Sequence, residues 1–167
     1  MGIEDHQDGL DDVAWERLRR VVSAANQGKR RAFKSEFRRW STEISLGDQH
    51  RIGIYLLGAT KYITRRTLKR QPTESDLKNL AARCFPDVSK VVTAHAMAVE
   101  DTLRIMFDLP AVRRELSPGE LLVLGAAITG CLLTSPADEL PEIRQYVAAW
   151  WKVNAHVFHD QGVADSG

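Results

Sequence analysis

The longest stretch of the sequence without a charged side chain runs from Leu121 to Ala137, and it constrains the fold more than any other feature. It follows a helix-start sequence, Ser117 to Glu120, which combines an N-cap serine, a proline at the first helical position and a glutamate three residues after the cap. A helix that is apolar on all sides has to be buried on all sides. We therefore predict that residues 117–134 form a buried central helix against which the other helices pack.

Most of the remaining chain also has a helical pattern. Apolar residues recur at spacings of three and four, glycines and prolines separate the patterns, and no stretch alternates apolar and polar residues as a strand would. The sequence therefore predicts an all-α fold, a helical bundle of about seven helices in a single domain that spans residues 10–159. The helices predicted around the central one cover approximately residues 10–25, 29–45, 48–70, 74–84, 88–107 and 141–159. An acidic leader (residues 1–9) and a polar tail (residues 160–167) are predicted to be disordered.

Two prolines are expected to interrupt helices. Pro86 is predicted to separate the fourth helix from the fifth, and Pro141 to separate a turn after Ser135 from the final helix. The fifth helix would then place His95 on its apolar face. A buried histidine can become a catalytic base, although a hydrogen-bonded core histidine is the commoner outcome.

The composition is that of an ordinary globular protein. The chain has 167 residues, of which 44% are hydrophobic and 27% charged, so it can bury a core. Its two cysteines, Cys84 and Cys131, are far apart and belong to no C-x-x-C pair, which indicates neither a disulfide framework nor a metal–thiolate site. No uncharged stretch reaches the roughly 18 residues that a membrane span needs. We expect a cytoplasmic protein with no membrane partner.

The small net charge of +1 conceals a segregation of charge along the chain. Residues 1–16 contain six acids and no Lys or Arg, residues 17–70 contain fifteen Lys or Arg and three acids, and residues 71–167 are acidic overall. A chain that is nearly neutral in total can therefore still present a strongly positive surface.

This charge distribution is the main functional hint. We predict a non-enzymatic binding or regulatory module in which the basic region 29–70 faces an acidic partner. Direct nucleic-acid binding through the same residues is the first alternative, because clustered cations bind phosphates. Pairing with acids of the same chain, or across an oligomer, is the structural alternative. Whether the cations of the two helices form one patch or two depends on how these helices pack. The predicted surface consists of Arg30, Arg31, Lys34, Arg38, Lys61, Arg65, Arg66, Lys69 and Arg70.

Three further features suggest other functions. His156 and His159 have the spacing of metal ligands on one helix face, and with His95 they leave open a metal-dependent enzyme, although the sequence contains no catalytic motif and indicates no cofactor. The small residues from Gly125 to Gly130 predict either tight helix packing or the wall of a cavity for a small-molecule sensor. The adjacent tryptophans 150 and 151 point in different directions on a helix, so Trp150 or Trp151 is a candidate for a homo-oligomer interface.

Overall fold

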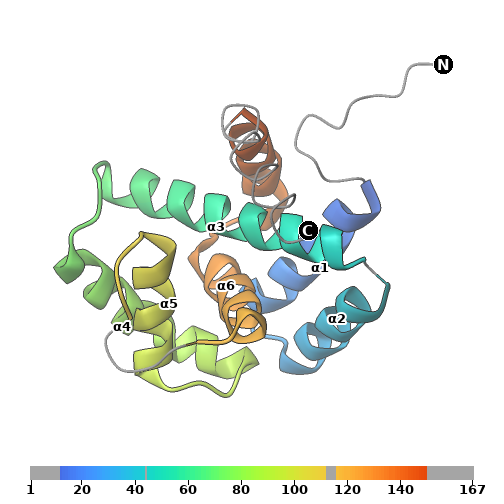
Figure 1. Ribbon diagram of the computed structural model, residues 1–167, viewed down its shortest axis with the longest axis horizontal. Helices are drawn as coiled ribbons and strands as arrows, with labels where there is room; N and C mark the ends of the chain where they lie inside the picture. The colour runs from blue at the N-terminus through green and yellow to red at the C-terminus, as the bar shows by residue number, and fades with distance from the viewer. Residues whose placement is uncertain (1–11, 44, 112–115, 150–167) are drawn as a thin grey trace, which may run out of the picture.

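The computed structural model describes residues 12–43, 45–111 and 116–149. These residues form seven helices and no strand, which confirms the predicted all-α fold (Figure 1). The predicted leader and tail lie outside the described residues. The helices are α1 (Asp12–Asn26), α2 (Arg30–Glu43), α3 (Leu46–Leu68), α4 (Glu74–Val91), α5 (Ala96–Met106), α6 (Pro118–Leu132) and a final helix at residues 136–149.

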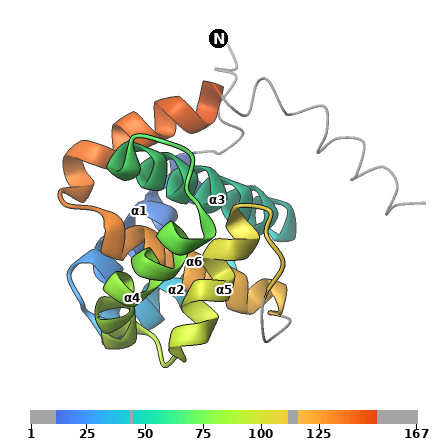
Figure 2. The same cartoon turned by 90° about the vertical axis from the view of Figure 1, so that its left-hand side faces the viewer.

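The helix α6 contacts four other helices, namely α1, α3, α4 and α5. In Figure 1, α3 runs across the molecule above α6, with α4 and α5 to one side and α1 and α2 to the other, and Figure 2 shows the same arrangement from the side of α4 and α5. Every residue from Leu124 to Gly130 is buried. The first turns are not: Gly119 is exposed, and Leu121 and Val123 are half-buried. The burial predicted for the whole helix therefore applies to residues 124–130, since Cys131 and Leu132 are half-buried again.

The C-terminal half of α6 packs directly on the backbone of α1. A Cβ atom added at Gly130 would lie 2.5 Å from the Ala25 Cβ and 2.6 Å from the Val22 carbonyl oxygen, so only glycine fits there. The Asn26 Nδ2 group then donates hydrogen bonds to the carbonyls of Gly130, at 3.0 Å, and Leu133, at 2.6 Å. Asn26 thus gives the Leu133 carbonyl a partner and the Gly130 carbonyl a second one, beside the Leu133 amide at 3.3 Å. At Gly130, the missing side chain therefore serves tight packing rather than a cavity.

The predicted break at Pro86 is wrong, because α4 continues through it to Val91. A capping box is present at the start of the helix, where Thr73 and Asp76 exchange hydrogen bonds. Proline removes the hydrogen bond to the carbonyl of residue 82, but Pro86 and Ala82 both face solvent, so water can replace that bond. One buried stripe therefore continues past the proline, formed by Leu77, Leu80, Ala81, Cys84, Val88 and Val91.

The position of His95 also differs from the prediction. The chain leaves the helix at Val92, and α5 begins only at Ala96, so His95 is the exposed N-cap of α5 with extended backbone angles rather than a buried residue within a helix. The predicted separation at Pro141 is wrong as well. The final described helix already begins at residue 136 and passes Pro141, whose side chain is exposed.

Candidate binding surface

The nine predicted basic residues do not form one surface. The helix α2 packs against α1 and α4, whereas α3 packs against α6, α1 and α5. In Figure 1 the C-terminal end of α3 lies at one end of the molecule and α2 near the other. Lys61 belongs to neither group, since its Nζ lies 3.6 Å from an Asp108 carboxylate oxygen just beyond α5. The cations therefore form two separate groups, Arg30, Arg31, Lys34 and Arg38 on α2 and Arg65, Arg66, Lys69 and Arg70 at the end of α3.

The group at the end of α3 surrounds a hollow of about 630 Å³. Tyrosines supply its aromatic part: the rings of Tyr62, from α3, and Tyr146, from the final described helix, have centroids 4.5 Å apart and planes inclined by 34°. The Arg66 guanidinium lies 5.7 Å from the centroid of the Tyr62 ring. We call this site the basic hollow and define it by Tyr62, Arg65, Arg66, Lys69, Arg70 and Tyr146.

Arg66 in the basic hollow is held by an ion pair with Glu139, a nearly buried carboxylate at the start of the final helix. The same carboxylate accepts hydrogen bonds of 2.6 Å from the backbone amides of Thr134 and Ser135. Burial raises the pKa of Glu139, but the Ser135 amide, Arg66 and the Thr134 amide together outweigh burial, and the pKa is lowered. Glu139 is therefore ionised at neutral pH and neutralises Arg66.

Arg70 is neutralised in a similar way. Its guanidinium makes two contacts with the Asp76 carboxylate, of 2.5 and 2.8 Å. This arginine, followed by the Thr73 amide, lowers the pKa of Asp76 well below its usual range. Because Asp76 also completes the capping box of α4, whose N-cap is Thr73, the pair ties the end of α3 to the start of the next helix.

Arg65 and Lys69 differ from Arg66 and Arg70 in their surroundings. Both side chains are exposed, and neither makes an ion pair or hydrogen bond with the part of the chain that the structure describes. Lys69 also has a left-handed backbone, with φ of 58°, and its amide donates to the Arg65 carbonyl at 2.7 Å, which ends α3. A residue with a Cβ atom costs roughly 1–2 kcal/mol in this conformation, which glycine adopts freely. The end of α3 thus presents two cations that have no counter-charge among the described residues.

The basic residues on α2 can be compared with those of the basic hollow. Arg30 donates a hydrogen bond to the Thr93 hydroxyl, whereas Arg31 and Lys34 are exposed and, among the described residues, also lack an ionic partner. These two cations match Arg65 and Lys69 in charge and exposure but do not line the basic hollow.

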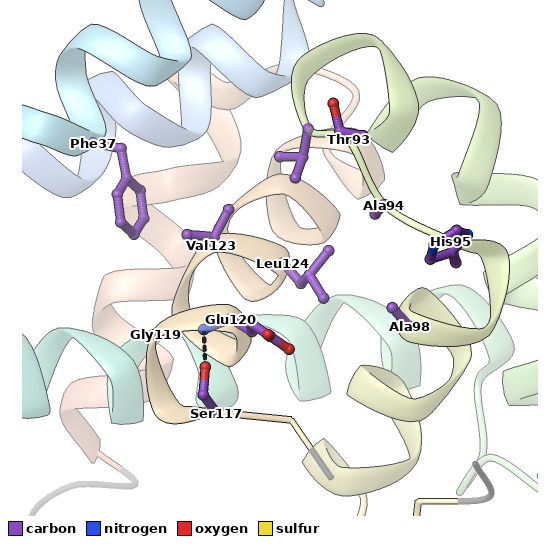
Figure 3. Close-up of a pocket in the computed structure, with 11 residues that line it drawn as sticks. Phe37, Thr93, Ala94, His95, Ala98, Ser117, Gly119, Glu120, Val123 and Leu124 are labelled. Atoms are coloured by element: carbon purple, nitrogen blue, oxygen red, sulfur yellow. Dashed lines mark hydrogen bonds between the residues drawn. The ribbon is translucent and has the colours of Figure 1, made fainter. Parts of the chain in front are cut away.

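A second hollow, of about 620 Å³, lies where the N-terminal ends of α5 and α6 approach each other (Figure 3). Phe37 lies on one side of it, His95 and Ala98 lie on the other, and Glu120 and Val123 of α6 lie between them. The His95 side chain makes no hydrogen bond with a described residue. Nothing in this part of the chain therefore orients His95 as a general base.

The other predicted sites have no support in the described residues. No group of three or more His, Cys, Asp or Glu side chains is placed to hold a metal ion in residues 12–43, 45–111 and 116–149. His156 and His159, and the predicted interface residues Trp150 and Trp151, lie outside these ranges. Burial raises the pKa of the Cys84 thiol to about 11 and that of Cys131 to about 12, so neither is a reactive thiolate at neutral pH.

No helix in the described ranges is long and apolar enough to cross a membrane. The structure thus defines an all-α protein with a basic hollow at one end. In comparisons with known proteins, no protein-family model, no characterised protein and no solved structure matches the chain. The function therefore has to be argued from the site itself.

Proposed function

We propose that the protein is a non-enzymatic binding module that takes an acidic segment of a partner protein into the basic hollow. The observation that carries the proposal is the difference among its four cations. Arg66 and Arg70 are fixed by internal carboxylates, while Arg65 and Lys69 point to solvent without a counter-charge in the described chain. A carboxylate of the partner would supply that counter-charge.

The residues around Arg65 and Lys69 support the proposed binding of an acidic segment. The ion pairs of Arg66 and Arg70 hold the walls of the basic hollow in place, so a ligand does not have to order them when it binds. The two tyrosines add rigid surface beside the cations, as aromatic residues do at interfaces. Lys69 retains its side chain at a left-handed position where glycine would remove the strain, and strained positions are concentrated at functional sites.

A short acidic segment fits this charge distribution better than a nucleic acid. Nucleic-acid affinity comes largely from several cations that each neutralise a phosphate along an extended strand. Among the described residues, only two exposed cations of the basic hollow have no partner, and the other basic group lies elsewhere on the molecule. Two such cations suit two neighbouring carboxylates.

The test measures binding of a fluorescein-labelled polyglutamate peptide by fluorescence anisotropy at about 50 mM salt, where contacts between charges are favoured. The double variant Arg65→Glu with Lys69→Glu should bind at least about tenfold more weakly than the wild type. The matched control is Arg31→Glu with Lys34→Glu, which changes the net charge equally but leaves the basic hollow intact. It should bind almost as well as the wild type.

Two outcomes would contradict the proposal. Equal loss of binding in both double variants would mean that the peptide responds only to net charge. A labelled single-stranded oligonucleotide that binds more tightly than the peptide, and loses binding in the Arg65 and Lys69 variant, would assign the site to nucleic acid instead. Thermal unfolding of each variant checks that the fold is retained.

A further inference from the structure

A third hollow lies on another side of α6, between α3, α5 and the first turns of α6. Its volume is about 410 Å³, and no charged side chain among the described residues lines it. We call it the apolar hollow and define it by Gly53, Leu57, Ile105, Met106, Leu121 and Leu122.

The apolar hollow exists because the N-terminal half of α6 is not fully covered. The side chains of Leu57, Ile105 and Leu121 are only half-buried, although each comes from a helix that packs into the core. On the side of α3, Gly53 lets Leu122 pack closely, since a Cβ atom there would lie 3.0 Å from a methyl group of Leu122. Apolar surface left facing water is unfavourable, and any apolar molecule that covered it would gain that free energy.

The dimensions indicate what kind of molecule fits. The volume falls in the range of about 300–1,000 Å³ that is typical of small-molecule sites, and such sites are lined mainly by apolar side chains. A stable protein interface needs roughly 800 Å² from each partner, far more surface than this hollow offers. A charged ligand would lose its hydration here without gaining an ion pair.

We propose that the apolar hollow binds a small uncharged apolar molecule, such as one with an alkyl chain or an aromatic ring. This site is separate from the basic hollow, since the two share no residue. The inference therefore does not depend on the proposed binding of an acidic partner.

The experiment uses N-phenyl-1-naphthylamine, an uncharged probe whose fluorescence rises in apolar surroundings, on the full chain. The wild type should bind it saturably, and decan-1-ol should displace it. Leu121→Trp fills the apolar hollow and should weaken probe binding by at least about tenfold. Val123→Trp adds the same side chain to the same helix, but at the hollow shown in Figure 3, and should leave binding nearly unchanged.

Leu121→Glu provides a second variant in case the tryptophan does not fold, because a half-buried position tolerates a charge that reaches solvent. It should also weaken binding, while thermal unfolding shows that the fold is retained. The inference is overturned if the wild type shows no saturable binding. It is equally overturned if folded Leu121 variants bind the probe as well as Val123→Trp does.

Discussion

The two halves of α6 have similar apolar sequences but very different surroundings. Residues Leu124 to Gly130 are all buried, and Gly130 lies directly against the backbone of α1. Leu121, Leu122 and Val123 are at least as apolar, yet they are half-buried and line hollows on two sides of the helix. At Gly130 the missing side chain lets the α1 backbone approach closely, while the larger Leu124 and Ile128 are buried in the same stretch. An apolar sequence therefore permits burial, and the neighbouring helices decide which part of it is covered.

The largest loss of stability is expected for Gly130→Ala. Its Cβ would collide with the Val22 carbonyl and the Ala25 Cβ, so α1 and α6 would have to separate. Overpacking costs up to about 3 kcal/mol, and better helix propensity returns roughly 1 kcal/mol, which leaves a net loss of about 2 kcal/mol. Urea unfolding would measure this loss.

Gly125→Ala is the matched control for that variant. A Cβ there would lie 2.9 Å from the Met106 Cε, the end of a flexible side chain that can move away. The stability should stay within about 1 kcal/mol of the wild type. Equal losses for the two variants would show that contact with the α1 backbone is not what distinguishes Gly130.

An intermediate effect is expected for Asn26→Ala, which removes both hydrogen bonds to the C-terminal end of α6. The Leu133 carbonyl would lose its bond to Asn26 in a part-buried site, and the Gly130 carbonyl would keep only the bond from the Leu133 amide, at a cost of about 1–2 kcal/mol in urea unfolding. Gln27→Ala changes the exposed neighbour and should alter stability by less than about 0.5 kcal/mol. If Asn26→Ala left the stability unchanged, water would be able to replace these hydrogen bonds.

The smallest effect is expected for Ser117→Ala at the other end of α6. The Ser117 hydroxyl accepts a hydrogen bond of 3.2 Å from the Glu120 amide. Its loss should cost at most about 1 kcal/mol, because this exposed turn lets water reach the amide. Ser117→Asp should restore the stability, since aspartate is an equally good cap. If Ser117→Ala lost more stability than Asn26→Ala, the N-terminal end of α6 would contribute more to stability than its C-terminal end, contrary to expectation.

Much of the fold could be predicted from local signals. The all-α class follows from the helical spacing of apolar residues, and the cap at Ser117 is found where the sequence predicts it. The error at Pro86 had a visible counter-signal: Cys84, Val88 and Val91 continue the spacing of the preceding stripe without a shift. A proline on the solvent side of a helix does not have to end it. The error at His95 followed from the same wrong boundary.

The candidate site could be predicted only in part. The cations from Arg65 to Arg70 are visible as a cluster at a helix end, but their division into paired and exposed members depends on Glu139 and Asp76, which come from other helices. The tyrosine contact joins Tyr62 and Tyr146, which are far apart in the sequence. Such a contact depends on the packing of α3 against the final helix, and no periodicity within one helix reveals it. The separation of the cations on α2 from those at the end of α3 likewise depends on how the helices pack.

The left-handed backbone of Lys69 links the stability of the turn after α3 to the charge of the basic hollow. Glycine or asparagine at this position would relax the left-handed turn, but either one would also take a positive charge out of the basic hollow. For the proposed binding of an acidic segment, selection for greater stability and selection for tighter binding would therefore act in opposite directions on Lys69.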